Sequence, residues 1–524
     1  MIKRFVPWIV CGVFLLYLAA SAVSRPLQPG SRFDIARFAR LPVSLAGRVQ
    51  PFDSVAQVAL SRIRGSAFVP VSLAKQSHGG VLDANEWLLE VLAKPDAADA
   101  RKIFPIAEPK LIEKLSLKPP PSPASEGDPA EARPRRSPFE SKRTEAGAAS
   151  RPAYYAFQEL AAKGTEIGKE TKRIAGQKPE QRAPWERELL GLQMQLSTYE
   201  RLKNSVQPNS LLQLQAKGRP VVFNFAQELN KFRVDMQEAV RIARRRKNGS
   251  TERLDAPTEQ RIRTFAGLFQ GVSRLSVLAA VPPAGANPRA PWTNTGTAIV
   301  DCARGGRLSP SIAYVAGIVS TFAAGDAAGF NERVTKYERW LASNGLSAQV
   351  RQAGYETFYN VFQPFVRAVF AYGVGLVLLV AAWRTRSKAA YRSALMLVGL
   401  GLALHAMGLA FALTLGGQPG FATFAGWAVA LIALVAGWFR RSHAGTATAA
   451  VTGFVVLMLA FVFTAGGAAS LARNVLDIRF LAALVLTAGA IGLAAIVRRS
   501  RTTNSGQIRS YANYHVSRRS VPTQ

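Results

Sequence analysis

The sequence predicts an all-α fold: a polytopic membrane bundle of about six transmembrane helices, with a large, mostly helical domain inserted between the first and second spans. Each of six apolar runs is close to the roughly 20 residues that a helix needs to cross a hydrocarbon core of about 30 Å. The segment between the first two runs is polar and basic, and its apolar residues recur at helical spacing. The six runs are residues 5–23, 365–383, 393–415, 423–439, 449–468 and 480–497.

Charges beside these runs predict that both termini lie in the cytoplasm. Basic residues 3 and 4 precede the first run; the loop 384–392 is basic, whereas the loop 416–422 is uncharged. Short cytoplasmic loops carry an excess of Lys and Arg. The expected location is therefore a bacterial cytoplasmic (inner) membrane, with the large domain in the periplasm. The small residues 19–22 also resemble a signal-peptide cleavage site, but we favour an uncleaved anchor because the apolar core is long.

These features predict six successive parts of the chain. Residues 118–153 are rich in Pro, Ser, Ala and charge, which predicts a disordered linker because too little apolar surface is present to stabilise a fold. The predicted parts are an N-terminal membrane anchor at 1–24, a first part of the periplasmic domain at 25–117, the linker at 118–153, a periplasmic helical domain at 154–363, a five-helix membrane domain at 364–498 and a cytoplasmic tail at 499–524.

Within the large domain, helices are predicted at 183–204, from 223, and near 309–324 and 327–344. The first of these is the clearest amphipathic pattern. Its apolar residues are predicted to lie on or near one side: Leu189, Leu192, Met194, Leu196, Tyr199 and Leu202.

The net charge bears on the expected partners, and the cysteine positions bear on disulfide formation. The chain has 66 Lys and Arg against 33 Asp and Glu, a formal net charge of +33. Nucleic acid is not an expected partner, because a translocated domain rarely meets it and no nucleic-acid motif is present. Anionic lipid headgroups or an acidic partner are favoured, while a codon bias towards Arg explains the charge equally well. Cys11 lies in a predicted span and Cys302 in the large domain, which argues against a disulfide between them.

One histidine stands out among the four. His405 lies inside a predicted span, where an ionisable group is costly and tends to face the bundle interior, a cavity or a ligand. Neutral imidazole is a good axial ligand of haem iron; the alternative is an interhelical hydrogen bond without a ligand. His78, His443 and His515 lie in polar segments and are assigned no role. No Ser-His-Asp, Cys-His, HExxH or P-loop pattern occurs, so no catalytic residue is predicted.

Four stretches in consistent order carry a resemblance. They are LPVSLAGRVQPFDSVAQVALSRIRG at 41–65, ANEWLLEVLAKPDAADARKIFPIAEPKL at 84–111, ETFYNVFQPF at 356–365 and LHAMGLAFALTLGGQPG at 404–420. Together they resemble the bacterial system II cytochrome c biogenesis proteins, the haem-handling cytochrome c synthases. The resemblance implies that haem is a cofactor or cargo, that His405 is a candidate haem axial ligand, and that the partners are apocytochrome c, other cytochrome c biogenesis membrane proteins and the lipid bilayer.

The departures from this family are also informative. Ala412 stands where the family has an Arg, and Leu484 stands where a periplasmic His is expected. The family's C-terminal tryptophan-rich haem-binding part has no counterpart in this sequence. The sequence alone does not distinguish a natural C-terminus from a truncation or a frameshift. We therefore expect haem handling or delivery in cytochrome c maturation, without haem attachment by this chain alone. The alternatives are a non-catalytic membrane scaffold of cytochrome assembly and, ranked lower, a transporter or sensor.

Overall fold

The computed structural model describes residues 8–9, 11–16, 18–19, 32–65, 68–70, 81–118, 152–217, 219, 223–283, 290–414, 421–439 and 443–464. The chain divides into two compact units. The membrane unit comprises Met1–Pro26 and Phe358–Gln524, and the outer unit comprises Leu27–Thr357. Most of the predicted linker, the last apolar run and the predicted tail lie outside the described residues.

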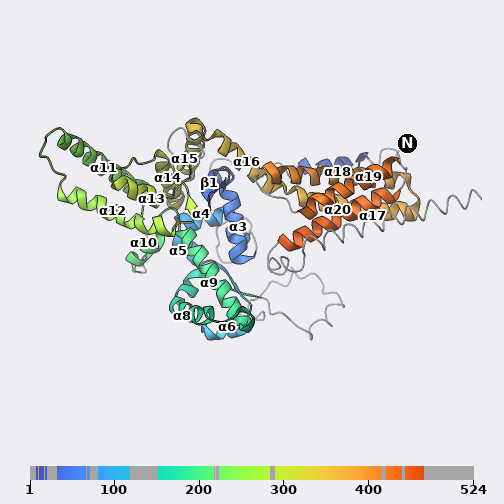
Figure 1. The fold of residues 1–524 in the computed structure, drawn as a ribbon, viewed down its shortest axis with the longest axis horizontal. Helices are drawn as coiled ribbons and strands as arrows, with labels where there is room; N and C mark the ends of the chain where they lie inside the picture. The colour runs from blue at the N-terminus through green and yellow to red at the C-terminus, as the bar shows by residue number, and fades with distance from the viewer. Residues whose placement is uncertain are drawn as a thin grey trace, which may run out of the picture. The chain divides into compact units, whose positions relative to one another are not determined.

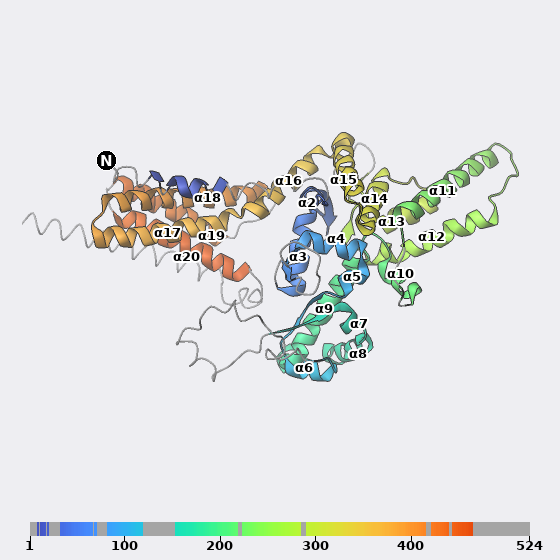
Figure 2. The ribbon, with the colours of Figure 1, turned by 180° about the vertical axis from the view of Figure 1, so that it is seen from behind.

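Four long helices build the membrane unit. Within the described residues, four helices are long and apolar enough to cross a membrane, so the chain is a membrane protein. Helix α17 packs against α18 and α20, and α19 packs against α20 (Figures 1 and 2). Of the six predicted spans, the first is described only in part and the last not at all. The four helices are α17 (Pro364–Thr385), α18 (Lys388–Thr414), α19 (Phe421–Phe439) and α20 (His443–Thr464).

Parts of the first apolar run join this unit. The described residues among 8–19 are helical. Leu18 is buried in the same hydrophobic cluster as Tyr372 of α17 and Val398 of α18, and Phe14 packs against that cluster. The first run therefore contributes to the packing of the membrane unit.

The outer unit is mostly helical, and α11 and α12 form a helical hairpin (Figure 1). Its helices begin with α2 (Ile35–Ala39), α3 (Phe52–Arg64), α4 (Ala84–Ala93), α5 (Pro95–Asp99), α6 (Pro109–Lys114), α7 (Phe157–Ala161) and α8 (Gly164–Ala175). They continue with α9 (Pro184–Lys203), α10 (Asn209–Ala216), α11 (Phe225–Lys247), α12 (Ala256–Leu275), α13 (Thr295–Ala303), α14 (Pro310–Ala324), α15 (Ala327–Leu341) and α16 (Ser347–Phe362). The helices predicted at 183–204, from 223, and near 309–324 and 327–344 are thus confirmed, as α9, α11, α14 and α15.

The prediction of an all-α fold needs a correction, because the outer unit also holds three small antiparallel sheets. Strands of two to five residues are too short to show a clear alternation of apolar and polar residues. One sheet has the order β2-β1-β7, and the others pair β3 with β4 and β5 with β6. The strands are β1 (Pro42–Leu45), β2 (Arg48–Pro51), β3 (Phe68–Pro70), β4 (Val81–Asp83), β5 (Lys102–Ile106), β6 (Ala153–Ala156) and β7 (Leu278–Ala279).

The turn between β1 and β2 contains a glycine in a conformation that glycine favours. Ala46 and Gly47 join β1 to β2 with φ angles of 51° and 82°. Two successive positive φ values are typical of the tight hairpin turn that fits the twist of antiparallel strands, and glycine adopts them most easily.

Strand β6 pairs with β5 in the register Ile106↔Ala153, so the predicted linker ends inside an ordered strand.

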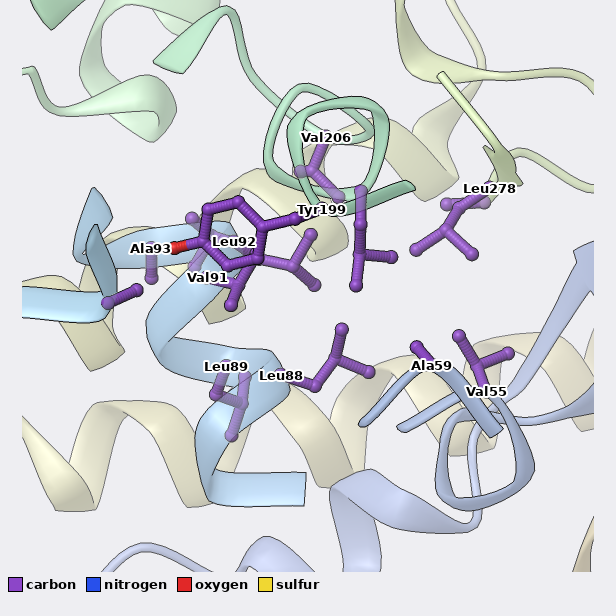
Figure 3. Close-up of a cluster of buried hydrophobic side chains, with 14 of the residues drawn as sticks. Val55, Ala59, Leu88, Leu89, Val91, Leu92, Ala93, Tyr199, Val206 and Leu278 are labelled. Carbon is purple, nitrogen blue, oxygen red and sulfur yellow. The ribbon is translucent and has the colours of Figure 1, made fainter. Parts of the chain in front are cut away.

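The core of the outer unit forms around α4 (Figure 3). Asp83 caps the start of this helix, and its side chain accepts hydrogen bonds from the backbone N–H groups of Asn85 and Glu86. Leu88, Leu89, Val91 and Leu92 of α4 are buried beside Val55 and Ala59 of α3, Tyr199 of α9, and Val206 and Leu278.

Helix α9 supplies one wall of this core, and one of the residues predicted to face the core does not do so. Five of the six residues predicted to share a side are buried, whereas Met194 is 67% exposed. At 100° per residue, Met194 is turned about 200° from Leu192 and so points away from the core.

Candidate functional site

The sequence-predicted site residue His405 lies on the buried face of α18. Its side chain is 0% exposed. Gly401 and Gly408, one turn before it and one turn after it, lie on the same face and are buried as well. The helix therefore presents an imidazole between two positions that have no side chain.

Two aromatic rings of α17 pack on this face. The ring centroids of Phe365 and Tyr372 lie 5.7 Å and 6.3 Å from that of His405, both edge to face. A Cβ at Gly408 would lie 2.6 Å from the Phe365 ring, and one at Gly401 would lie 3.0 Å from Cδ1 of Tyr372. The two glycines thus make room for the rings that contact His405.

Several buried polar atoms here have no hydrogen-bond partner among the described residues. They are Nδ1 and Nε2 of His405 and the hydroxyl of Tyr372. The backbone of Thr423 approaches His405, but no hydrogen bond of good geometry forms. An unsatisfied buried polar group costs about 1–3 kcal/mol, so a cluster of them needs an explanation such as a ligand or water.

The donor set fits one kind of metal-containing ligand. In the part of the chain that the structure describes, no group of three or more His, Cys, Asp or Glu side chains gathers to hold a metal ion. A bare ion would lack ligands, whereas haem carries four porphyrin nitrogens and needs the protein only for axial positions. Either ring nitrogen of His405 could fill one of these positions. The chemistry of the site therefore suits haem better than a free metal ion.

A second cluster brings three of the resemblance segments together in the outer unit. Glu356 of α16 is buried; it accepts a hydrogen bond from Ser54 Oγ at 2.6 Å and pairs with Arg48 Nη2 at 2.7 Å. Asp53, the neighbour of Ser54, accepts a hydrogen bond from Asn85 Nδ2 at 2.9 Å. Residues from 41–65, 84–111 and 356–365 are thus linked by their polar side chains.

Replacing Glu356 with Gln should destabilise the outer unit by about 1–2 kcal/mol, because Arg48 loses its charged partner and an amide N–H₂ replaces one acceptor. Chemical denaturation of the full-length protein in detergent, followed by tryptophan fluorescence, measures this. Glu338→Gln is the matched control: its pair with Arg37 is also long-range in sequence, but both side chains are more than 30% exposed. Equal effects of the two substitutions would contradict a special role for Glu356.

The sequence identified His405 but missed the groups around it. Phe365 and Tyr372 are seven residues apart, which places both on one face of α17 and was the available signal. Of the other histidines, His443 is exposed at the start of α20 with its ring 3.9 Å from that of Tyr391. His78 and His515 lie outside the described residues.

No protein-family model matches the chain, and no curated protein is significantly similar to it. The resemblance to the system II cytochrome c biogenesis proteins therefore rests on the sequence motifs alone.

Proposed function

We propose that this protein handles haem for the maturation of c-type cytochromes, as a multi-pass protein of a bacterial inner membrane whose large domain is periplasmic. The observation that carries the proposal is the burial of His405 inside a membrane bundle, with neither ring nitrogen partnered by any residue that the structure describes. The motif order in the sequence supports it, as does the linking of three of those motifs through Glu356, Ser54 and Asp53.

In this proposal haem is the cargo and His405 is one axial ligand. Phe365 packs edge-on against the imidazole, so its ring would have to move aside for haem to reach His405. Phe365 lies in the first turn of α17, two residues after Gln363, which caps the helix in a left-handed backbone conformation (φ 45°). Haem would then lie among apolar spans that shield its macrocycle from water.

We assign delivery rather than attachment to this chain. The candidate ligand is buried among membrane-spanning helices, whereas thioether formation requires haem to be presented to apocytochrome c at the outer face. The partners would be apocytochrome c and other cytochrome c biogenesis membrane proteins.

Haem content tests the proposal. Full-length protein purified in mild detergent from haem-replete cells is expected to show a Soret band, and His405→Ala should lose most of it. His443→Ala removes an exposed histidine of the same unit and should retain haem. A haem-free wild-type protein, or a His405→Ala variant that keeps its haem, would contradict the proposal.

The second candidate function is a non-catalytic scaffold of cytochrome assembly. The packing of Phe365 and Tyr372 favours it, because these rings already cover two sides of the imidazole. The same measurement separates the two functions, since a scaffold would be folded, monodisperse and colourless.

A further inference from the structure

A cavity of about 750 Å³ opens at the end of the membrane unit where α17 ends and α18 and α20 begin. Its lining combines three cations with an aromatic wall. The cations are Arg384, Arg386 and Lys388, and the wall contains Tyr391 and His443. This site lies on residues that the haem proposal does not use.

The wall of the cavity is held in place by contacts between two helices. The rings of Tyr391 on α18 and His443 on α20 meet edge to face at 3.9 Å. The hydroxyl groups of Tyr391 and Thr446 are 3.2 Å apart and form a hydrogen bond. The cavity is therefore a defined feature of the helix packing rather than a gap beside one loop.

No described residue of the membrane unit offers these cations a counter-charge. The sequence contains no Asp or Glu between Glu356 and Asp477. Among the described residues of the membrane unit, Arg384, Arg386 and Lys388 therefore have no carboxylate to pair with. Three cations around one cavity repel each other, and an anion placed among them removes that repulsion.

The position of the cavity selects the kind of anion. Trp383 is 77% exposed at its edge, at the end of a membrane-crossing helix, where tryptophan side chains lie at the level of lipid headgroups. Leu379 and Ala382, which precede Trp383 on α17, give the cavity an apolar side on the helix that crosses the membrane. Basic pockets between transmembrane helices are typical binding sites of anionic lipid headgroups.

We propose that this cavity binds the phosphodiester headgroup of an anionic phospholipid, with Arg384, Arg386 and Lys388 contacting the phosphate. A free phosphate ion shares this chemistry but would not use the apolar side of the cavity. The inference is independent of haem binding.

Native mass spectrometry of the full-length protein in neutral detergent, titrated with phosphatidylglycerol or phosphatidylcholine, tests the site. The wild type is expected to bind phosphatidylglycerol at least about tenfold more tightly than phosphatidylcholine. The double variant Arg386→Gln/Lys388→Gln should lose about 25-fold in affinity for phosphatidylglycerol, since each cation near a headgroup contributes a factor of about five. Arg392→Gln, which removes an exposed cation of α18 that does not line the cavity, is the control and should bind normally.

Equal binding of the two lipids, or normal phosphatidylglycerol binding by the double variant, would overturn the proposal. A third arm adds inorganic phosphate to the lipid-bound protein. Displacement of the lipid by phosphate at concentrations equal to those of the lipid would assign the site to a free anion instead. Phosphate that fails to compete supports the lipid site.

Discussion

Replacing Lys203 with Met is expected to lower the free energy of unfolding of the outer unit by about 3–5 kcal/mol, the usual effect of removing one partner of a buried ion pair. Lys203, at the end of α9, is buried, and its Nζ lies 3.1 Å from Oδ2 of Asp99 at the end of α5. Asp99 is buried too, so the substitution would leave a carboxylate without its cation in a place with little water.

The neighbouring groups show why this pair is well formed. Tyr199 donates a hydrogen bond to Oδ1 of Asp99 at 2.8 Å, and Gln213 of α10 bonds to both Lys203 and Asp99. Burial and the nearby Asp99 carboxylate raise the pKa of Tyr199 well above its usual value, so the phenol stays a neutral donor. Lys203 Nζ also lies 4.3 Å from the centroid of the Phe157 ring. One lysine thus holds α5, α9 and α10 together.

The matched control for this substitution is Lys231→Met on α11. Lys231 pairs with Glu228 at 2.7 Å, but its side chain is largely exposed, and an exposed pair contributes about 0–1 kcal/mol. Urea denaturation of the full-length protein, followed by tryptophan fluorescence, measures both. Similar losses in the two variants would show that the Lys203 network does not stabilise the fold as described.

Replacing Gly445 with Val should disrupt the membrane unit, at a cost of about 3 kcal/mol or more, the upper end for overpacked cores. Gly445 of α20 crosses α19 at backbone distance: a Cβ there would lie 2.4 Å from Cα of Gly437 and 2.5 Å from the carbonyl oxygen of Ala433. Small residues let membrane helices approach this closely, and the backbone atoms cannot move aside as a side chain can.

The control is Gly399→Val on α18, where a Cβ would meet no described atom within 4 Å. Thermal stability in detergent and the monodisperse fraction on size-exclusion chromatography report the effect. Gly445→Val should unfold at a lower temperature and aggregate, and Gly399→Val should behave as the wild type. Normal behaviour of Gly445→Val would mean that α19 and α20 do not cross as the structure shows.

Long periodic patterns allowed much of this fold to be predicted from the sequence. Helix α9 and the apolar spans depend on spacing within one segment, which the sequence displays directly. The short strands depend on partners far along the chain: β1 pairs with β7, more than 200 residues away. No local pattern reveals such a pairing.

The same contrast between local patterns and long-range packing applies to the site at His405 and to the Glu356 cluster. His405 could be identified because an ionisable residue in an apolar run is unusual by itself. Its neighbour Tyr372 was missed, because its contact with the imidazole depends on how α17 and α18 pack. The bond between Ser54 and Glu356 spans 302 positions of the sequence.

The central claim, that the imidazole at position 405 binds haem iron, is tested most directly by chemical rescue. His405→Gly keeps the bundle but removes the ligand, leaving space for free imidazole. Absorption spectra of this variant with added haem should lack the wild-type Soret band, and millimolar imidazole should restore it. A variant that binds haem as the wild type does without imidazole, or one that stays folded and remains colourless with it, would contradict the account.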